Sequence, residues 1–173
     1  MKQFLANLWE IIEVVVVAGV TVFIIRTYVV QPFLVSGQSM EPNFQGGNYL
    51  LIDEVSYRFE KPKREDVIVF RYPGDEKTFY IKRIIGIPED QVVVDNGRVS
   101  INGKILDEDY LADDARTVGN INKKLGPDEY FVMGDNRDYS FDSRQWGVLP
   151  QENIIGVVRL RLFPLNKIQI YAQ

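Results

Sequence analysis

The fold is decided by residues 66–86, which read DVIVFRY PGDEK TFYIKRIIG. The segments 66–72 and 78–86 are rich in β-branched and aromatic residues, which predicts two strands. The polar segment between them begins with Pro73-Gly74, a pair that is typical of turns. Strands joined by so short a turn lie antiparallel, so this stretch predicts part of an antiparallel sheet.

Further β segments lie on both sides of this hairpin. Two Asn-Gly pairs, at 96–97 and 102–103, are flanked by β-branched residues and predict two successive tight hairpins, because Asn-Gly tolerates positive φ. We also expect strands at 49–52, 129–133 and 153–163, whereas the acidic segment 107–124 indicates a surface excursion. The chain therefore predicts a mainly β fold, with an antiparallel sheet closed or folded over in a barrel-like way that hides strand edges.

The N-terminal segment has a different pattern. Residues 14–25 carry no charge, and the window from Leu8 to Tyr28 has the roughly 20 residues that a membrane-spanning helix needs. Trp9 and Tyr28 would lie at the two interfaces as aromatic anchors. We expect residues 1–30 to form one N-terminal transmembrane helix and residues 31–173 to form the β domain.

Two other interpretations of this segment stay open. Glu10 and Glu13 are compatible with a buried or in-plane amphipathic helix. A cleaved secretory signal fits less well, because no small-x-small pair ends the apolar run cleanly. The charges specify the orientation only weakly, since Lys2 and the terminal amine favour a cytoplasmic N-terminus and Arg26 opposes it.

Composition excludes several kinds of site. The 173 residues contain no Cys and no His, which rules out thiol nucleophiles, disulfides, Cys- or His-ligated metals and a Ser-His-Asp triad. Any catalytic base must be Lys, Asp, Glu or Tyr. The formal net charge of −4 argues against a nucleic-acid partner. We expect no metal and no other cofactor.

Two segments combine polar residues with sharp turns or apolar neighbours. In 35–43, Gly37 and Pro42 bracket a turn that would present Ser39, although a plain loop has the same composition. In the strand 79–85, alternation places Lys82 on one face between an aromatic and a β-branched side chain, where lost hydration would lower the pKa of its amine. The alternative is a lysine whose stem packs and whose amine reaches water.

The segment 134–144 reads GDNRDYSFDSR, with three Asp and two Arg. It can be a solvated turn, a calcium loop, or a buried network of ion pairs and hydroxyls that supports a site. Calcium is disfavoured because Arg137 takes a position where the EF-hand spacing needs an oxygen ligand. With His and Cys absent, Ser plus Lys is the available nucleophile–base pair for acyl transfer.

Four motifs, in order, resemble those of bacterial type I signal peptidases. They follow the N-terminal apolar segment and span residues 36–42, 64–70, 80–86 and 134–144. The resemblance covers most of the chain and is to members without a large inserted second domain. It implies a catalytic domain of the signal peptidase type. It also implies a membrane-bound serine endopeptidase that removes signal peptides from exported preproteins through an acyl-enzyme.

The resemblance assigns roles residue by residue. Ser39 would be the nucleophile, Lys82 the general base and Ser140 the residue that orients Lys82. Asp142 and Arg144 would form a supporting ion pair, with Asp135 and Arg137 in the same network. The residues that match shallow pockets for small side chains, at the first and third positions before the cut, are Phe33, Val35, Met40, Tyr80 and Ile81.

The resemblance also implies an oxyanion site and a location. The main-chain N–H of Ser39 would donate to the oxyanion, whereas Gly37 stands where one branch of the family has a second, hydroxyl donor. The protein would be a single-pass protein of the cell membrane with its catalytic domain on the extracytoplasmic side. Its partners would be signal peptides and membrane lipid.

Three other functions fit parts of the pattern. A LexA-type self-cleaving protease uses a similar catalytic fold, but it usually carries a DNA-binding domain where this chain has an apolar segment. A conjugation or pilus maturation peptidase would use the same dyad on a narrower substrate. A membrane-tethered β module without catalysis would have no need of Ser39, Lys82, Ser140 and Asp142 together.

Overall fold

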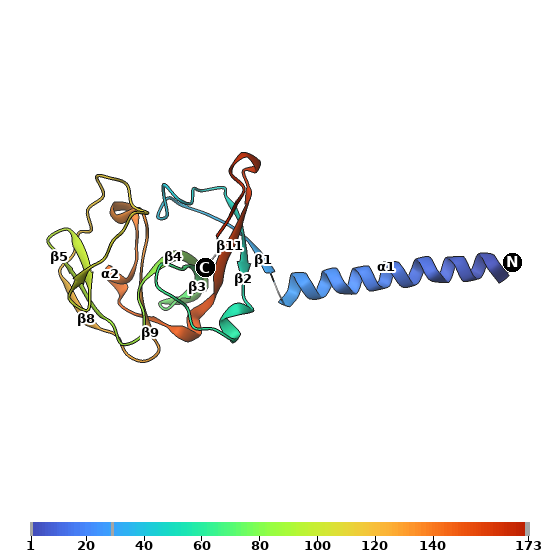
Figure 1. Ribbon diagram of the computed structural model, residues 1–173, viewed down its shortest axis with the longest axis horizontal. Coiled ribbons are helices and arrows are strands. Elements are labelled where there is room, and N and C mark those ends of the chain that lie inside the picture. Colours follow the sequence, from blue (N-terminus) through green and yellow to red (C-terminus); the bar gives the residue numbers. More distant parts are fainter. Residues whose placement is uncertain (1, 29, 172–173) are drawn as a thin grey trace.

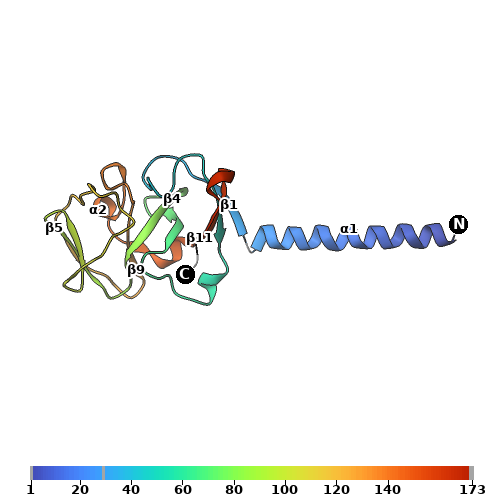
Figure 2. The ribbon, with the colours of Figure 1, turned by 45° about the horizontal axis from the view of Figure 1, so that its top comes forward.

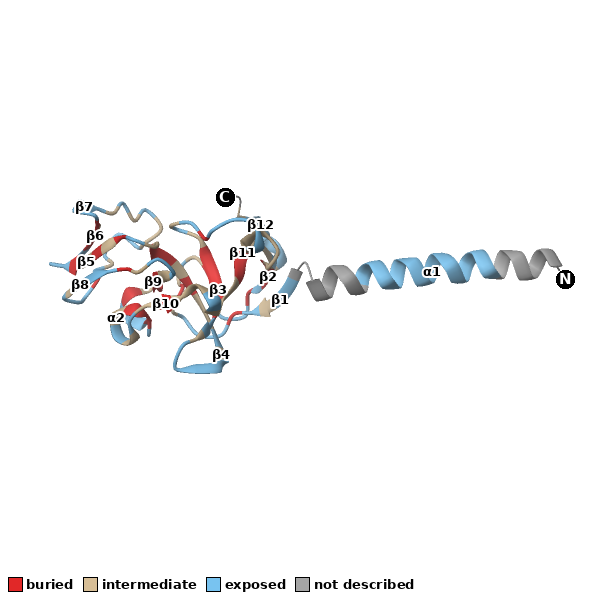
Figure 3. Ribbon diagram, turned by 90° about the horizontal axis from the view of Figure 1, so that it is seen from below, coloured by how far each residue is buried: buried red, intermediate tan, exposed pale blue. Residues whose placement is uncertain are grey.

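The protein consists of one long N-terminal helix and a mainly β domain. The computed structural model describes the backbone of residues 2–28 and 30–171, and the side chains of residues 9–22 and 31–171. Helix α1 (Lys2–Tyr28) extends away from the β domain as a single rod (Figures 1 and 2). Its side chains from residue 9 to residue 22 are exposed (Figure 3).

The expected membrane span, from about Leu8 to Tyr28, falls within α1, and its ends lie outside the residues whose side chains are described. Within the described part of the chain, no helix combines the length and the apolarity that a membrane span requires.

The expectation of a mainly β, antiparallel fold is confirmed. The larger sheet has eight strands in the order β1-β2-β11-β3-β4-β9-β10, with β12 paired to β11, and its pairs are antiparallel. Its strands are β1 (Val30–Leu34), β2 (Tyr49–Asp53), β3 (Val67–Tyr72), β4 (Asp75–Gly86), β9 (Glu129–Met133), β10 (Leu149–Pro150), β11 (Ile154–Phe163) and β12 (Gln169–Ile170).

A smaller antiparallel sheet follows the order β7-β6-β5-β8. It consists of β5 (Gln91–Asp95), β6 (Arg98–Ile101), β7 (Lys104–Ile105) and β8 (Ile121–Lys124). The short helical turns are η1 (Ser56–Arg58), η2 (Arg137–Tyr139), α2 (Ser143–Trp146), η3 (Gln151–Asn153) and η4 (Leu165–Lys167).

The two Asn-Gly pairs form the predicted hairpins. Asn96-Gly97 joins β5 to β6 and Asn102-Gly103 joins β6 to β7, and all four residues have positive φ. The segment 107–124 differs from the expected surface excursion, because its end forms β8 and pairs with β5. A polar strand of this kind has no clear alternation of apolar residues, so the sequence pattern does not reveal it.

Strand β3 is buried on both faces, which explains its unbroken run of apolar residues. Val67 and Val69 pack into one core cluster with Leu50, whereas Ile68 and Phe70 pack into another on the opposite face. A third cluster lies where the end of β4 and strand β9 meet the smaller sheet. Strand β4, hydrogen-bonded between β3 and β9, is therefore a rigid base for the side chains that it carries.

A close contact between β11 and β2 gives a test of this packing. A Cβ on Gly156 in β11 would lie 2.3 Å from Asp53 O, a backbone atom that cannot turn aside. Gly156→Ala should force the two strands apart and lower the melting temperature of the detergent-solubilised chain by about 4–8 °C, or about 2 kcal/mol.

Gly126→Ala is the matched control, because its Cβ would meet only the Glu129 side chain, at 3.4 Å. Its melting temperature should stay close to that of the wild type. Equal melting temperatures for both variants would contradict the packing described for β11.

Candidate active site

The loop that carries Ser39 is held firmly on the core. It lies between β1 and β2, and its two ends are joined by hydrogen bonds from Val35 N to Asn48 O and from Gly47 N to Val35 O, both 2.9 Å. Met40 and Phe44 are almost fully buried and anchor its centre. Ser39 itself stays partly exposed, so its hydroxyl is presented at a sharp bend.

The structure brings Lys82 and Ser39 together. Lys82 lies on β4 opposite Ile68 of β3 and is only 3% exposed. Its Nζ donates hydrogen bonds to Ser39 Oγ at 2.7 Å and to Ile81 O at 2.9 Å. The Tyr80 ring lies beside the amine, with its centroid 5.4 Å from Nζ.

Burial lowers the pKa of Lys82 to about 8, because the charged amine has lost its hydration. The charges of Asp142 and Asp135 oppose this effect and raise the pKa. Each of these carboxylates is paired with an arginine, Asp142 with Arg144 and Asp135 with Arg83. The loss of hydration outweighs the attraction of the two carboxylates, so the net shift of the Lys82 pKa is downward.

The segment 134–144 packs directly against the Ser39 loop. Asn136 N donates to Ser39 O at 3.0 Å, and Asn136 Nδ2 donates to Gln38 O at 3.1 Å. The approach is so close at Gly134 that a Cβ there would lie 2.3 Å from both Ser39 O and Ser140 Oγ. Glycine is therefore required at this position by space.

The predicted supporting residues lie in this segment and are buried. Asp142 accepts hydrogen bonds from Arg144 Nε and Nη2, both at 2.9 Å, and from Gly134 N at 3.1 Å. Asp142 also caps α2 through Arg144 N, in a capping box completed by Gln145. Ser140 Oγ accepts from Gly134 N at 3.1 Å. The hydrogen bonds described for Lys82 Nζ go to Ser39 and Ile81, not to Ser140.

Asp135 and Arg137 do not pair with each other. Both oxygens of Asp135 accept from Arg83, at 2.8 and 2.7 Å, and one also accepts from Asn43 Nδ2. Arg137 pairs instead with Glu108, from the segment between β7 and β8. One hydrogen bond links Arg137 to the Asp142–Arg144 pair, because Arg144 Nη2 donates to Arg137 O at 2.6 Å. Within the described residues, no group of three or more potential ligands gathers as a metal site.

A small pocket opens beside Ser39 and Lys82. Its volume is about 120 Å³, and four of the five predicted pocket residues, Phe33, Val35, Tyr80 and Ile81, line it. The fifth, Met40, is almost fully buried in the core behind it. The lining also includes Leu34, Ser36, Leu50, Val69 and Phe79. So small and apolar a space admits small side chains and excludes large ones.

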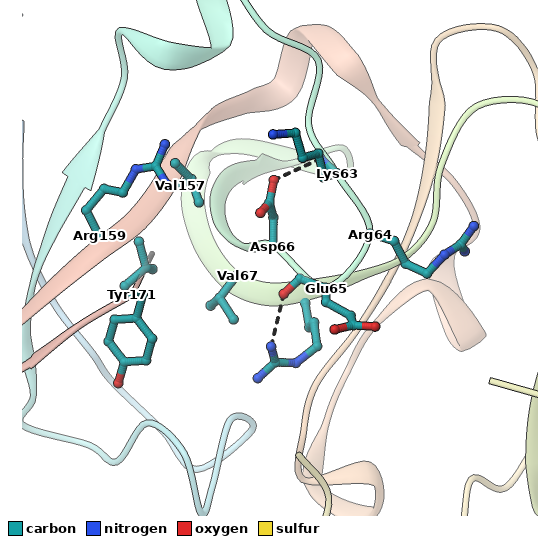
Figure 4. A pocket seen from close by; sticks show the side chains of 10 residues that line it. Lys63, Arg64, Glu65, Asp66, Val67, Val157, Arg159 and Tyr171 are labelled. Atoms are coloured by element: carbon teal, nitrogen blue, oxygen red, sulfur yellow. Dashed lines mark hydrogen bonds between the residues drawn. The ribbon is translucent and has the colours of Figure 1, made fainter. Parts of the chain in front are cut away.

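A second cavity, of about 340 Å³, lies at the start of β3 between β4 and β11 (Figure 4). Neither Ser39 nor Lys82 lines it. Its arginines have partners within the fold, since Arg64 pairs with Asp90, Arg159 with Asp53, and Arg83 Nη1 donates to Glu65 O. The pocket beside Ser39 is therefore the better candidate for the binding of an apolar substrate.

Comparison with known proteins identifies the family. The model of a family described as "Signal peptidase, peptidase S26" matches residues 8–163, which is most of the chain. The chain belongs to the signal peptidase family. The resemblance inferred from the four motifs is thus confirmed, and with it the assignment to a family of peptidases.

Individual relatives agree with this membership. A probable signal peptidase I-2 of Synechocystis sp. is 39% identical over 94% of this chain and 77% of its own length. A signal peptidase I P of Bacillus subtilis subsp. natto is 35% identical, over 97% of this chain and 96% of its own. The crystal structure of a signal peptidase I from Enterococcus faecalis is 31% identical, with a TM-score of 0.50 over 57% of this chain and 97% of that chain.

Sequence reasoning missed several residues that hold the site of this signal peptidase together. Arg83, which pairs with Asp135, follows Lys82 directly in the sequence. Alternation along β4 places the two side chains on opposite faces, and this is the only local signal that Arg83 has a role different from that of Lys82. Asn136 contributes mainly a backbone N–H, which no side-chain pattern reveals. Glu108 lies among other acidic residues of the segment 107–114, so its pairing with Arg137 has no sequence signal.

The contact at Gly134 generates a prediction about activity. Because a Cβ at this position would overlap Ser39 O and Ser140 Oγ, Gly134→Ala must push the segment 134–144 away from the Ser39 loop. We expect kcat for preprotein cleavage to fall by about 100-fold or more, since misplacement by about 1 Å costs that much.

Gly126→Ala serves again as the control and should keep the wild-type kcat. The measurement is made below the melting temperature of each variant, so that loss of fold does not contribute. Wild-type kcat in folded Gly134→Ala protein would show that the close approach at Gly134 has no part in catalysis.

Proposed function

We propose that this protein is a membrane-anchored serine endopeptidase that cleaves signal peptides from exported preproteins with a Ser39–Lys82 dyad. The observation that carries the proposal is the 2.7 Å contact between Lys82 Nζ and Ser39 Oγ, made by a lysine that is only 3% exposed. Its membership of the signal peptidase family and the names of its relatives support the substrate class.

The reaction starts with the neutral Lys82 amine. Its lone pair takes the Ser39 hydroxyl proton, and Ser39 Oγ attacks the carbonyl carbon of the scissile peptide bond. The oxygen becomes an oxyanion, to which the Ser39 main-chain N–H donates. When the C–N bond breaks, protonated Lys82 gives its proton to the leaving amine, and an ester between Ser39 and the signal peptide remains.

The second half of the reaction releases the enzyme. Neutral Lys82 takes a proton from water, whose oxygen attacks the ester carbonyl. Collapse of this second tetrahedral intermediate breaks the ester bond and returns the proton to Ser39 Oγ. The products are the signal peptide, with a new carboxylate, and the mature protein, with a new amine.

The segment 134–144 would keep the dyad aligned. Asp142 and Arg144 fix the segment, Asp135 fixes it to β4 through Arg83, and Arg137 fixes it to the segment between β7 and β8. We assign to Ser140 the role of accepting a hydrogen bond from the Lys82 amine during turnover. Its hydroxyl is buried next to Gly134, and this position supports the assignment.

Substrate selection would follow from the pocket of about 120 Å³. Phe33, Val35, Tyr80 and Ile81 would contact small side chains at the first and third positions before the cut, and Met40 would support the pocket floor from the core. In an extended peptide, alternate side chains point the same way, so one shallow cavity can serve both positions.

The location would follow from the N-terminal segment. We assign residues 1–30 to a single-pass anchor in the cell membrane and residues 31–173 to a catalytic domain on the extracytoplasmic side. The 13 residues from Arg26 to Ser39 reach at most about 45 Å when fully extended, which ties Ser39 close to the lipid surface. The apolar core of a signal peptide lies in the same membrane, so anchoring raises the effective concentration of both partners.

A cleavage assay tests the reaction and the dyad. The detergent-solubilised full chain should cut a preprotein after the last residue of Ala-x-Ala. Ser39→Ala and Lys82→Met should lower kcat/KM by at least about 1,000-fold, because each removes one member of a unit that acts together. Lys77→Met, at an exposed position of β4, is the matched lysine control and should keep full activity.

Other outcomes identify the competing functions. Cleavage of the chain itself with an intact preprotein would indicate the LexA type. Cleavage of a pilin-like precursor alone would indicate the narrower maturation peptidase. Bound but uncut substrate would indicate a binding module, and full activity of Lys82→Met would refute the role given to Lys82.

The pKa of Lys82 predicts the pH dependence of the reaction. Because the neutral amine is the active form and its pKa is about 8, kcat/KM should rise with pH and reach half of its plateau near pH 8. At pH 7 the rate should be roughly a tenth of the plateau. Stopped assays across pH 6–10 measure this profile, and a half-maximum near the ordinary lysine value would contradict it.

A further inference from the structure

The segment between β7 and β8 contains one acidic side chain that behaves unlike its neighbours. Asp107, Asp109, Asp113 and Asp114 are exposed, as expected of a surface excursion. Glu108 turns inward, and its side chain is only 11% exposed. Thr117, further along the same segment, is 1% exposed. This segment therefore reaches into the β domain at two points.

The side chains of Glu108 and Thr117 both contact Arg137, whose side chain is only 1% exposed. Its Nη1 donates to Glu108 Oε2 at 3.2 Å and to Thr117 Oγ1, and its Nη2 donates to Glu108 Oε1. Glu108 is the carboxylate that pairs with this guanidinium among the described residues. A buried guanidinium without a counter-charge is strongly destabilising, so Arg137 depends on Glu108 for its position.

Arg137 in turn holds the backbone next to Ser39. Its Nε donates to Gly134 O at 3.1 Å, and the N–H of Gly134 donates to Ser140 Oγ and Asp142. One residue before Arg137, Asn136 N donates to Ser39 O. A displacement of Arg137 is therefore transmitted through two backbone groups to the Ser39 loop.

A second path from Glu108 leads to the neighbour of Lys82. Tyr110 donates its hydroxyl proton to Glu108 Oε1 at 2.8 Å, and its ring lies 4.1 Å from the guanidinium carbon of Arg83. Asn43 Nδ2 donates to Tyr110 O at 2.7 Å and to Asp135 at 2.8 Å. Glu108 thus contacts residues that fix both the segment 134–144 and the Ser39 loop.

We propose that Glu108 is a positioning residue for peptide cleavage, which acts through Arg137 and Tyr110 to hold Ser39 and Lys82 in contact. This inference rests on the proposed function of the Ser39–Lys82 dyad. It gives the segment between β7 and β8 a part in catalysis without contact with the substrate. A merely structural role for Glu108 would affect melting temperature and leave kcat unchanged.

The test measures kcat and KM of the detergent-solubilised full chain on a preprotein, below the melting temperature of each variant. Glu108→Gln should lower kcat about tenfold or more and leave KM within about twofold, because Glu108 is not among the residues that line the pocket beside Ser39. Glu108→Asp keeps a carboxylate and should recover part of kcat. Asp113→Asn, at an exposed acid of the same segment, is the matched control and should equal the wild type.

A double variant keeps the test decisive if Glu108→Gln does not fold. Glu108→Gln with Arg137→Gln leaves no buried charge unpaired, and it should show the same loss of kcat. Wild-type kcat in a folded variant that lacks Glu108 would overturn the inference, even if its melting temperature is lower. Loss of kcat with an equal rise in KM would overturn it as well.

Two further samples, the wild type and Ser39→Ala, distinguish a failure of the proposed function from a failure of the inference about Glu108. Cleavage by the wild type and its loss in Ser39→Ala establish the proposed function independently of Glu108. If the wild type does not cleave, the proposed function fails and the inference about Glu108 fails with it. If the wild type cleaves and Glu108→Gln cleaves as fast, only the inference about Glu108 fails.

Discussion

The chemistry that we propose for this protein depends on a lysine amine kept out of water and against a serine hydroxyl. An ordinary lysine with a pKa of about 10.5 is neutral in only roughly one molecule in three thousand at pH 7. With the pKa lowered to about 8, roughly a tenth of the molecules carry a neutral amine. The nearby carboxylates of Asp142 and Asp135 act in the opposite direction and raise the pKa. Each of these carboxylates is held in an ion pair with an arginine, Asp142 with Arg144 and Asp135 with Arg83.

The fold meets this requirement by joining three parts that are distant in the chain. Strand β4, paired on both sides, fixes Lys82 in a rigid sheet. The loop between β1 and β2 brings Ser39 over it, held at its base by Val35 and Asn48. The segment 134–144, which follows β9 beside β4, closes the arrangement at Gly134. Each part is anchored separately, so the fold itself holds Ser39 and Lys82 in contact.

Local features of this structure could be predicted from the sequence, because their causes are local. The hairpins at Asn96-Gly97 and Asn102-Gly103 follow from two residues that tolerate positive φ. The apolar run 67–70 follows from burial of β3 on both faces. Strand β8 was not predictable, since its polar residues gain their pairing only from the neighbouring strand β5.

The site could be predicted only in part, because its contacts join residues far apart in the chain. Spacing alone does not bring Ser39 to Lys82 across 43 positions, and that expectation came from the motifs shared with a family. The pairs Arg83–Asp135 and Glu108–Arg137 have no local pattern. A charged residue looks the same in sequence whether it is solvated or buried, and only the fold determines which it is.

Direct titration of the amine tests the central claim most closely. The lysines can be labelled with ¹³C at Cε, and the signal of Lys82 can be assigned by its absence in Lys82→Met. The signal of a buried amine beside Ser39 should titrate with a midpoint near 8. A midpoint near 10.5, where an ordinary lysine titrates, would mean that the Lys82 amine is solvated and charged. The proposed dyad would then not exist.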